Sequence, residues 1–256
     1  MVSSMPDLPH ASVESTQKTL SGDQIEEFYH DQFVDDQTRH FVKLLGAHGS
    51  DGVVVDVGGG CGFFARLLMD STPFRVRVVD SDEKSIEACR RIGVGAVRGN
   101  ALAPDICGDE RIVALNLILH HLVGRSEAAT RELQSRALAV WLKQATSVFV
   151  NEYIYESYVA SLSGRLIFEI TASAFLSSVG RFVSRFIPVL RANTFNVGVR
   201  FRSHDEWRAL FGSAGYTVKN VVVGEPERVS PILRLLLIKQ IRRDSFLLEP
   251  RTKATR

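Results

Sequence analysis

The chain has 256 residues, of which 45% are hydrophobic and 23% charged, as expected for one globular domain of the larger sort. The net charge of only +2 argues against a dedicated nucleic-acid-binding protein. Three cysteines are too few for a disulfide framework and form no Cys-x-x-Cys pattern, which favours a reducing, cytoplasmic setting. No signal peptide is expected, and no apolar stretch reaches the roughly 20 residues that cross a membrane.

The first part of the chain alternates between predicted helices and strands. Residues 1–21 are polar and are expected to form a disordered tail, followed by a helix at 24–45. Short, β-branched apolar runs then predict buried parallel strands. These strands are predicted at 53–57, 75–79, 96–98, 112–117 and 147–150, and the helices between them at 63–69, 83–92 and 126–145. The alternation predicts an α/β fold, a parallel sheet covered by helices on both faces.

The last part of the chain has a different order of predicted elements. Residues 153–202 read as an insertion of mostly helical pattern, rich in Phe, Ser and Arg. A helix is predicted at His204–Ser213, and two strands at 216–224 and 233–241. No helix separates these strands, so they should pair antiparallel. The domain is expected to span 22–243, with a basic tail at 244–256.

The first predicted strand leads directly into a cluster of glycines. Glycines lack a Cβ, so a ligand can approach the backbone closely, and the following helix directs free N–H groups into the same space. Two patterns fit. Gly60–Ala65 matches the dinucleotide-binding pattern Gly-x-Gly-x-x-Gly/Ala. The pattern Asp-x-Gly-x-Gly-x-Gly is matched by Asp56, Gly58, Gly60 and Gly62.

Two acids beside the loop favour the second pattern. Asp80 ends the second predicted strand about 20 residues later, where a carboxylate can accept hydrogen bonds from both ribose hydroxyls of an adenosine. Asp56 precedes the loop, where an acid is unfavourable beside a pyrophosphate but favourable near the ammonium of a methionine moiety. The loop is therefore interpreted as a site for S-adenosylmethionine.

On these residues the chain resembles the class I S-adenosylmethionine-dependent methyltransferases of the small-molecule type, over residues 25–242. The segments that carry the resemblance are Val53–Gly62, Val78–Asp80, Gly99–Ala101, Ala114–Leu122, Phe201–Trp207 and Ala214–Tyr216. The resemblance implies a Rossmann-like, seven-stranded, mostly parallel sheet with an antiparallel last strand, to which the insertion adds a helical cap.

The resemblance also implies roles for residues of the cofactor site. Gly58, Gly60 and Gly62 would line the methionine part of S-adenosylmethionine, Asp80 would hold the ribose, and Asn116 would face the methionine tail. Asn100, followed by Ala101, takes the place where the family often has an Asp that reaches the adenine amino group; an amide accepts there without charge. Tyr29 either closes over the cofactor or packs its own helix.

Three residues are candidates for catalysis. His120 and His121 follow the fourth predicted strand and Glu152 the fifth, at the edge where open α/β sheets build their sites. Either histidine could deprotonate an acceptor hydroxyl or N–H, and Glu152 could orient the substrate. The alternative is structural: two adjacent histidines after this strand are frequent in the family, and Glu152 could stand at a solvated edge or at the start of a helix. No Cys/His spacing completes a metal site.

The insertion suggests the kind of substrate. Apolar residues between Leu166 and Leu190 fall near helical spacing and predict a lid over an apolar, aromatic pocket. A dimer interface or plain core explains the same spacing, and a membrane-surface helix is a third interpretation. The expected function is methyl transfer to O or N of a small, aromatic or lipophilic molecule of natural-product type, with S-adenosylhomocysteine as product.

Two other functions stay open. A nicotinamide-dependent oxidoreductase is disfavoured by Asp56 and by the absence of a Tyr-x-x-x-Lys pair after the fourth strand. A catalytically silent subunit that binds S-adenosylmethionine and serves a partner is compatible with the sequence, because methyl transfer needs few obligatory catalytic residues. The expected partner is the small-molecule substrate, with no nucleic acid and no membrane; a homodimer is also compatible.

Overall fold

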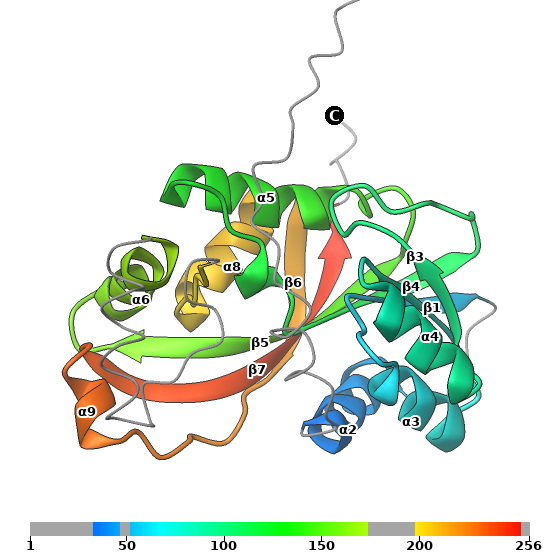
Figure 1. Ribbon diagram of the computed structural model, residues 1–256, viewed down its shortest axis with the longest axis horizontal. Coiled ribbons are helices and arrows are strands. Elements are labelled where there is room, and N and C mark those ends of the chain that lie inside the picture. The colour runs from blue at the N-terminus through cyan, green and yellow to red at the C-terminus, as the bar shows by residue number, and fades with distance from the viewer. Residues whose placement is uncertain (1–32, 47–51, 174–197, 252–256) are drawn as a thin grey trace, which may run out of the picture.

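The computed structural model describes residues 33–46, 52–173 and 198–251 (Figure 1). The predicted tail at 1–21, Tyr29, the first part of the helix predicted at 24–45 and most of the second half of the insertion lie outside these residues.

Seven strands form a single sheet in the order β3-β2-β1-β4-β5-β7-β6. β1 to β5 are parallel, and β7 lies antiparallel between β5 and β6. This confirms the predicted α/β, Rossmann-like sheet. The strands are β1 (Val53–Val57), β2 (Arg75–Asp80), β3 (Gly95–Arg98), β4 (Glu110–Asn116), β5 (Ser147–Ser157), β6 (Tyr216–Val222) and β7 (Ile238–Pro250).

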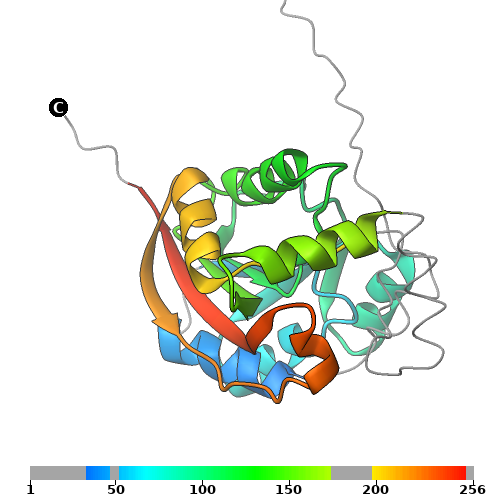
Figure 2. The ribbon, with the colours of Figure 1, turned by 90° about the vertical axis from the view of Figure 1, so that its left-hand side faces the viewer.

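Helices cover both faces of the sheet, as Figures 1 and 2 show. One core contains apolar residues of α2, α3 and α4, and the other contains Trp141 and residues of α5 and α8. Successive residues of β1, such as Val54 and Val55, point into opposite cores, and both are fully buried. Burial on both faces explains the continuous apolar run. The helices are α2 (Val34–Leu45), α3 (Phe63–Ser71), α4 (Glu83–Arg91), α5 (Glu127–Ala139), α6 (Leu162–Ala172), α8 (His204–Ser213) and α9 (Pro231–Arg234), with the 3-10 turn η1 (Leu119–His121). None of the helices in the described ranges is both long and apolar enough to cross a membrane.

The end of the domain differs from the prediction. The expected strand at 233–241 is replaced at its start by α9, which Pro231 opens and Ser230 caps, and β7 then runs from Ile238 to Pro250. Asp244, Phe246 and Leu248 are fully buried. The expected boundary at 243 and the basic tail from 244 are therefore wrong: residues 244–250 complete a central strand of the sheet.

The insertion also begins later than predicted. β5 continues to Ser157, because its polar residues Asn151 and Glu152 are buried with hydrogen-bond partners. α6 follows, and the chain returns beside β5, where Ile154 and Arg202 form a parallel bridge. Tyr155 N donates to the carbonyl of Arg202 at 3.0 Å.

Two fully buried arginines hold this returning segment against α5 and α8. Arg200 Nε and Arg202 Nη1 each donate to a different oxygen of Glu127, both at 2.7 Å. Arg200 Nη2 donates to Glu206 at 2.8 Å, and Arg202 Nε to Gln134 at 2.9 Å. The backbone N–H of Arg200 donates to the carbonyl of His120 at 2.9 Å. The ion pairs thereby fix the position of η1.

Replacing the shared acid should unfold the protein more easily. Glu127→Gln removes the carboxylate that two buried guanidinium groups share and leaves Arg200 with Glu206 alone, and breaking a buried charge network costs about 3 kcal/mol of unfolding free energy. Urea denaturation measures this loss. Glu132→Gln, an exposed acid on the same helix, is the matched control, and equal effects of the two variants would contradict the structural role of Glu127.

Candidate functional site

The glycine loop joins β1 to α3 at the carboxyl edge of the sheet. Gly58 has a φ of +71°, and a Cβ on it would lie 2.1 Å from Cδ1 of Ile118, so no other residue fits. Gly60 has a φ of +53°, but a Cβ on it would meet nothing within 4 Å. Gly62 begins α3 as its N-cap residue. The loop is thus tight against the protein at Gly58 and open at Gly60.

Asp80 lies beside the loop, as predicted. One carboxylate oxygen accepts the N–H of Gly60 at 2.9 Å, and the other accepts the N–H of Asp82, also at 2.9 Å. Burial raises the pKa of Asp80 in spite of these hydrogen bonds. The end of β2 therefore presents a half-buried acid next to the open part of the loop.

Asp56 and Asn116 form a buried acceptor pair at the neighbouring ends of β1 and β4. Asn116 Nδ2 donates to Asp56 Oδ1 at 3.3 Å. Asp56 Oδ2 and Asn116 Oδ1 are both buried without a hydrogen-bond partner among the described residues. Burial raises the pKa of Asp56 to about 7; the Asn116 hydrogen bond lowers it and the charge of Asp80 raises it further. Two acceptors that lack a donor fit a cationic ligand group.

Asn100 and Ala101 follow β3 and adjoin Asp80. Gly99 N donates to the carbonyl of Asp80 at 2.8 Å, which ties the two segments together. Asn100 Oδ1 accepts the N–H of Leu102 at 2.9 Å, so the side chain already orders its own turn. The predicted cofactor residues within the described ranges therefore lie along the carboxyl ends of β1 to β4.

His120, in the η1 turn that follows β4, and Glu152, in the middle of β5, form a buried dyad. Glu152 is fully buried and accepts from His120 Nδ1 at 2.7 Å and from the N–H of Leu119 at 2.7 Å. A carboxylate at Nδ1 holds the ring proton there, which leaves the lone pair on Nε2. The arrangement orients His120 as a proton acceptor.

His121 differs from His120 in its surroundings. Its ring centroid lies 4.1 Å from that of His120. Burial, followed by the proximity of His120, lowers the pKa of His121 well below its ordinary value, which keeps the ring neutral. The geometry therefore favours His120 over His121 as the histidine that is coupled to an acid.

An aromatic cluster adjoins the dyad and includes one residue that the sequence analysis did not select. Phe201 stacks on Tyr155 at 4.2 Å between ring centroids and lies 4.9 Å from His120. Tyr153 meets Phe201 edge to face at 5.8 Å. Burial raises the pKa of both tyrosines, so both remain neutral phenols. Phe201 stands between two arginines in the sequence and belongs to no helical pattern. The sequence therefore did not indicate that Phe201 lies beside β5.

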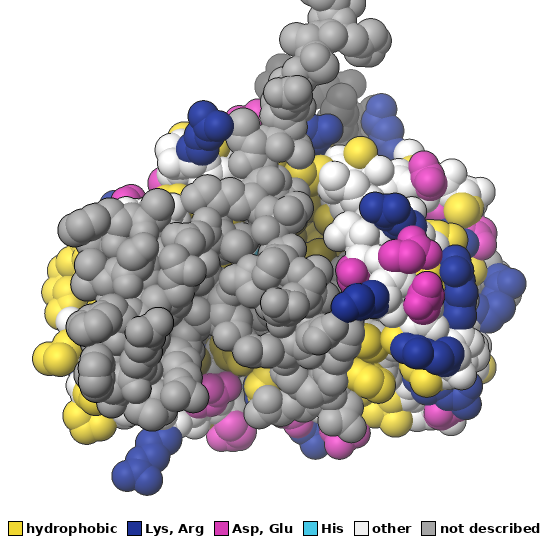
Figure 3. Space-filling model, viewed as in Figure 1, with side chains coloured by type: hydrophobic (Ala, Val, Ile, Leu, Met, Phe, Trp, Pro, Cys, Tyr) yellow, Lys and Arg dark blue, Asp and Glu magenta, His cyan; other side chains and the backbone are white. Residues whose placement is uncertain are grey.

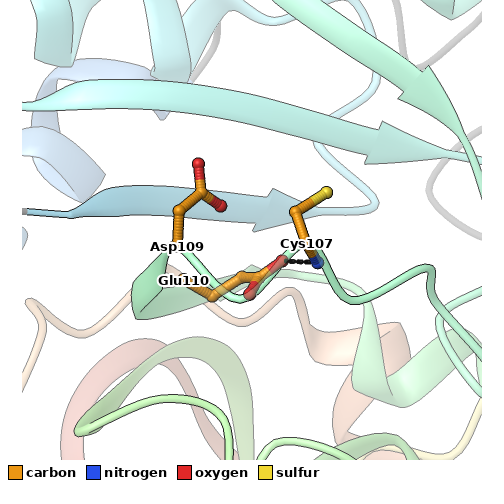
Figure 4. A group of neighbouring side chains, drawn as sticks. All are labelled: Cys107, Asp109 and Glu110. Atoms are coloured by element: carbon orange, nitrogen blue, oxygen red, sulfur yellow. Dashed lines mark hydrogen bonds between the residues drawn. The ribbon is translucent and has the colours of Figure 1, made fainter.

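One group of possible metal ligands occurs among the described residues, and it lies elsewhere. Cys107, Asp109 and Glu110 bring ligand atoms within 4.8 Å of one another at the amino end of β4, the opposite edge of the sheet (Figure 4). Arg77 donates to Asp109 at 3.0 Å and to Glu110 at 2.8 Å, and Glu110 also accepts the N–H of Cys107. The carboxylates already have a cation, so the group is a structural ion-pair cluster.

No model of a known protein family and no curated protein matches the chain, whereas many solved structures do. Mitomycin 7-O-methyltransferase MmcR matches with a TM-score of 0.54 and 15% identity, over 86% of this chain and 54% of that one. Geranyl diphosphate methyltransferase, solved with GPP and sinefungin, matches with 0.53 and 13%, over 86% and 77%. Magnesium protoporphyrin IX methyltransferase from Synechocystis PCC 6803, with bound SAH, matches with 0.50 and 15%, over 90% and 86%.

The chain has the class I S-adenosylmethionine-dependent methyltransferase fold. The strand order and the antiparallel β7 agree with the expected sheet. The chain spans little more than half the length of the mitomycin enzyme and of the pyocyanin biosynthetic protein PhzM, which it matches equally well.

A methyl group added at Gly60 should block the ligand without unfolding the protein. The space around Gly60 is open, so Gly60→Ala costs only the strain of a positive φ, about 1 kcal/mol. We expect S-adenosylhomocysteine binding, measured by calorimetry, to weaken roughly tenfold or more. Gly108→Ala is the matched control: its φ is +85°, its surroundings are equally open, and it lies at the other edge of the sheet. Unchanged binding in Gly60→Ala would contradict the assignment of the loop.

The raised pKa of Asp56 predicts an unusual dependence of stability on pH. Between its ordinary value of 3.8 and about 7, the folded protein holds a proton that the unfolded chain releases. The free energy of unfolding without ligand should therefore fall as the pH rises through this range. Asp56→Asn should reduce this slope, as measured by urea denaturation across pH; an unchanged slope would show that Asp56 is ionised in the folded state.

Proposed function

We propose that the protein binds S-adenosylmethionine at the loop Asp56–Gly62 and transfers its methyl group to O or N of a small molecule, releasing S-adenosylhomocysteine. The buried acceptor pair of Asp56 and Asn116 carries this proposal. A ligand ammonium supplies the donors and the positive charge that these two side chains lack. A pyrophosphate would place negative charge beside Asp56, which argues against a nicotinamide dinucleotide.

The other residues of the edge fit the rest of the cofactor. S-adenosylmethionine, when bound, supplies a methyl group already activated on a sulfonium. Asp80 would accept hydrogen bonds from the ribose hydroxyls, and Gly60 offers the open backbone against which the ligand lies. Asn100 and Ala101 would border the adenine. Tyr29 remains a proposed cover of the same site.

In this proposal His120 is the general base and Glu152 its orienting acid. The acceptor hydroxyl or N–H would give its proton to His120 Nε2, and the acceptor atom would take the methyl group that S-adenosylmethionine supplies, with S-adenosylhomocysteine as the leaving group. Glu152 accepts from Nδ1 at 2.7 Å and stabilises the imidazolium that forms. His121, kept neutral by burial, would pack against His120 and keep water out.

The aromatic cluster supports an aromatic or lipophilic substrate. Tyr153, Tyr155 and Phe201 give the region beside His120 an apolar, ring-lined character. Two of the similar proteins are also small-molecule methyltransferases, one for mitomycin and one for geranyl diphosphate. The proposed lid over this pocket, from residues 153–202, would exclude water during transfer.

The setting and the assembly belong to the same proposal. The cysteines Cys61, Cys89 and Cys107 are free, which favours a reducing, cytoplasmic compartment. The small-molecule substrate is the proposed partner. A homodimer through residues 153–202 remains a prediction that a measurement of molecular mass would test.

Replacing His120 should abolish turnover and spare cofactor binding. We expect His120→Asn to lower the rate about 100-fold or more, because the base is lost while the loop is intact. His204→Asn is the matched control, since His204 also contacts a buried acid, Asp244, at 2.8 Å, but on α8 and away from the loop. Equal rates in wild type and His120→Asn would rule out base catalysis by this residue.

The proposed reaction is tested by incubating the protein with S-adenosylmethionine and a panel of phenols, aromatic amines and prenyl compounds. Release of S-adenosylhomocysteine that depends on both protein and acceptor supports methyl transfer. Binding of S-adenosylhomocysteine without turnover of any acceptor would favour the catalytically silent subunit.

A further inference from the structure

The end of the long β5–β7 ribbon carries a group of exposed apolar side chains. β5 and β7 meet there: Ser157 pairs with Ile238, and Tyr158 N donates to the carbonyl of Leu237 at 3.0 Å. α6 begins and α9 lies at the same end of the molecule (Figure 1). The side chains of Tyr158, Val159 and Leu235 are 56%, 55% and 80% exposed. We call these residues, with the less exposed Leu162 and Ile232, the ribbon tip.

Most charged residues close to the ribbon tip in sequence are basic. Residues 157–168 and 229–243 contain no Asp or Glu, but they contain Arg165, Arg234, Lys239, Arg242 and Arg243. The last two are neutralised by acids outside these ranges. Arg165, Arg234 and Lys239 are exposed and form no ion pair with any other residue that the structure describes. The apolar side chains are therefore accompanied by three cations that form no ion pair within the described ranges, and the exposed Glu169 lies one turn after Arg165 on α6.

The backbone holds the ribbon tip in a costly conformation. Ala160 and Leu237 have φ values of +41° and +60°, and they are two of the four non-glycine residues with positive φ in the described ranges. The apolar run from Pro231 to Ile238 thus turns sharply and leaves Leu235 in solvent, although a continued strand could bury it. Figure 3 shows hydrophobic side chains at this end of the surface, with a basic side chain projecting beside them. Backbone strain and exposed Leu persist together where a surface has a use.

We propose that the ribbon tip is a docking surface for a membrane whose lipids carry negative headgroups. Leu235, Val159 and Tyr158 would enter the boundary between headgroups and acyl chains, and Arg165, Arg234 and Lys239 would pair with lipid phosphates. The contact is peripheral and needs no spanning helix, so it is compatible with the helices described above. It revises the expectation that the protein has no membrane partner.

A second copy of the chain fits the ribbon tip less well. In a symmetric dimer each tip would meet an identical one, and the cations of one copy would face those of the other. A membrane of negatively charged lipids instead offers acyl chains for the apolar side chains and headgroups of opposite charge for the cations. The tip also lies at one end of the molecule (Figure 1).

Vesicle sedimentation with the full chain tests the proposal. We expect binding to vesicles of phosphatidylglycerol and phosphatidylcholine, no binding to pure phosphatidylcholine, and release as the salt concentration rises. Leu235→Glu and Arg234→Glu should each reduce the bound fraction roughly tenfold. The matched controls are Val223→Glu, a 61% exposed valine elsewhere, and Arg208→Glu on α8. Each variant should retain the melting temperature of the wild type.

Three results would overturn the proposal. The first is a wild-type protein that binds no vesicle of either composition. The second is binding that the control substitutions weaken as much as the tip substitutions do. The third is a stable dimer, found by analytical ultracentrifugation, that Leu235→Glu dissociates, because a second copy of the chain would then cover the tip. None of these depends on methyl transfer, so the docking surface can fail independently of the proposed function.

Discussion

A buried carboxylate without a counter-charge is the constraint on which the site depends. Asp56 is fully enclosed at the end of β1, and its charge is opposed both by burial and by Asp80. A Cβ at Gly59 would lie 2.3 Å from Asp56 Oδ2, so the loop can cross the acid only as glycine. The acid, the loop and the open space at Gly60 therefore form one site. A bound cation would offset the free-energy cost of burying the charge of Asp56 in that site.

A second buried acid organises the neighbouring strand ends in a different way. Glu152 has hydrogen-bond donors from η1 and from His120, so its charge is already compensated by dipoles. Arg200 and Arg202 in turn hold the returning segment that contacts η1 and carries Phe201. Asp56 has one oxygen without a hydrogen-bond partner among the described residues, whereas both oxygens of Glu152 accept hydrogen bonds. In the proposed function this difference separates a side chain that would bind the ligand, Asp56, from a side chain that would orient a base, Glu152.

The sequence predicted the parts of the molecule whose cause is local. The strand β1 is a short β-branched run that is buried throughout, and α8 begins at a capping box of Ser203 and Glu206. The prediction from the sequence was least accurate for the bounds of β7. Arg242 and Arg243 concealed the continuation of this strand, because their partners Glu156 and Asp36 are distant in sequence. Long-range pairing also hid the buried Arg200 and Arg202, whose shared acid precedes them by 73 and 75 residues.

We propose that the loop that contains Gly60 and lies beside Asp80 binds an adenosyl sulfonium and not a dinucleotide. The most direct measurement is the melting temperature of the protein with S-adenosylhomocysteine, S-adenosylmethionine, NADH and NADPH in separate samples, because a ligand that binds only the folded state raises it. We predict a rise with the two adenosyl compounds alone. A rise with a nicotinamide dinucleotide instead would contradict the role of Asp56 and the function proposed from it.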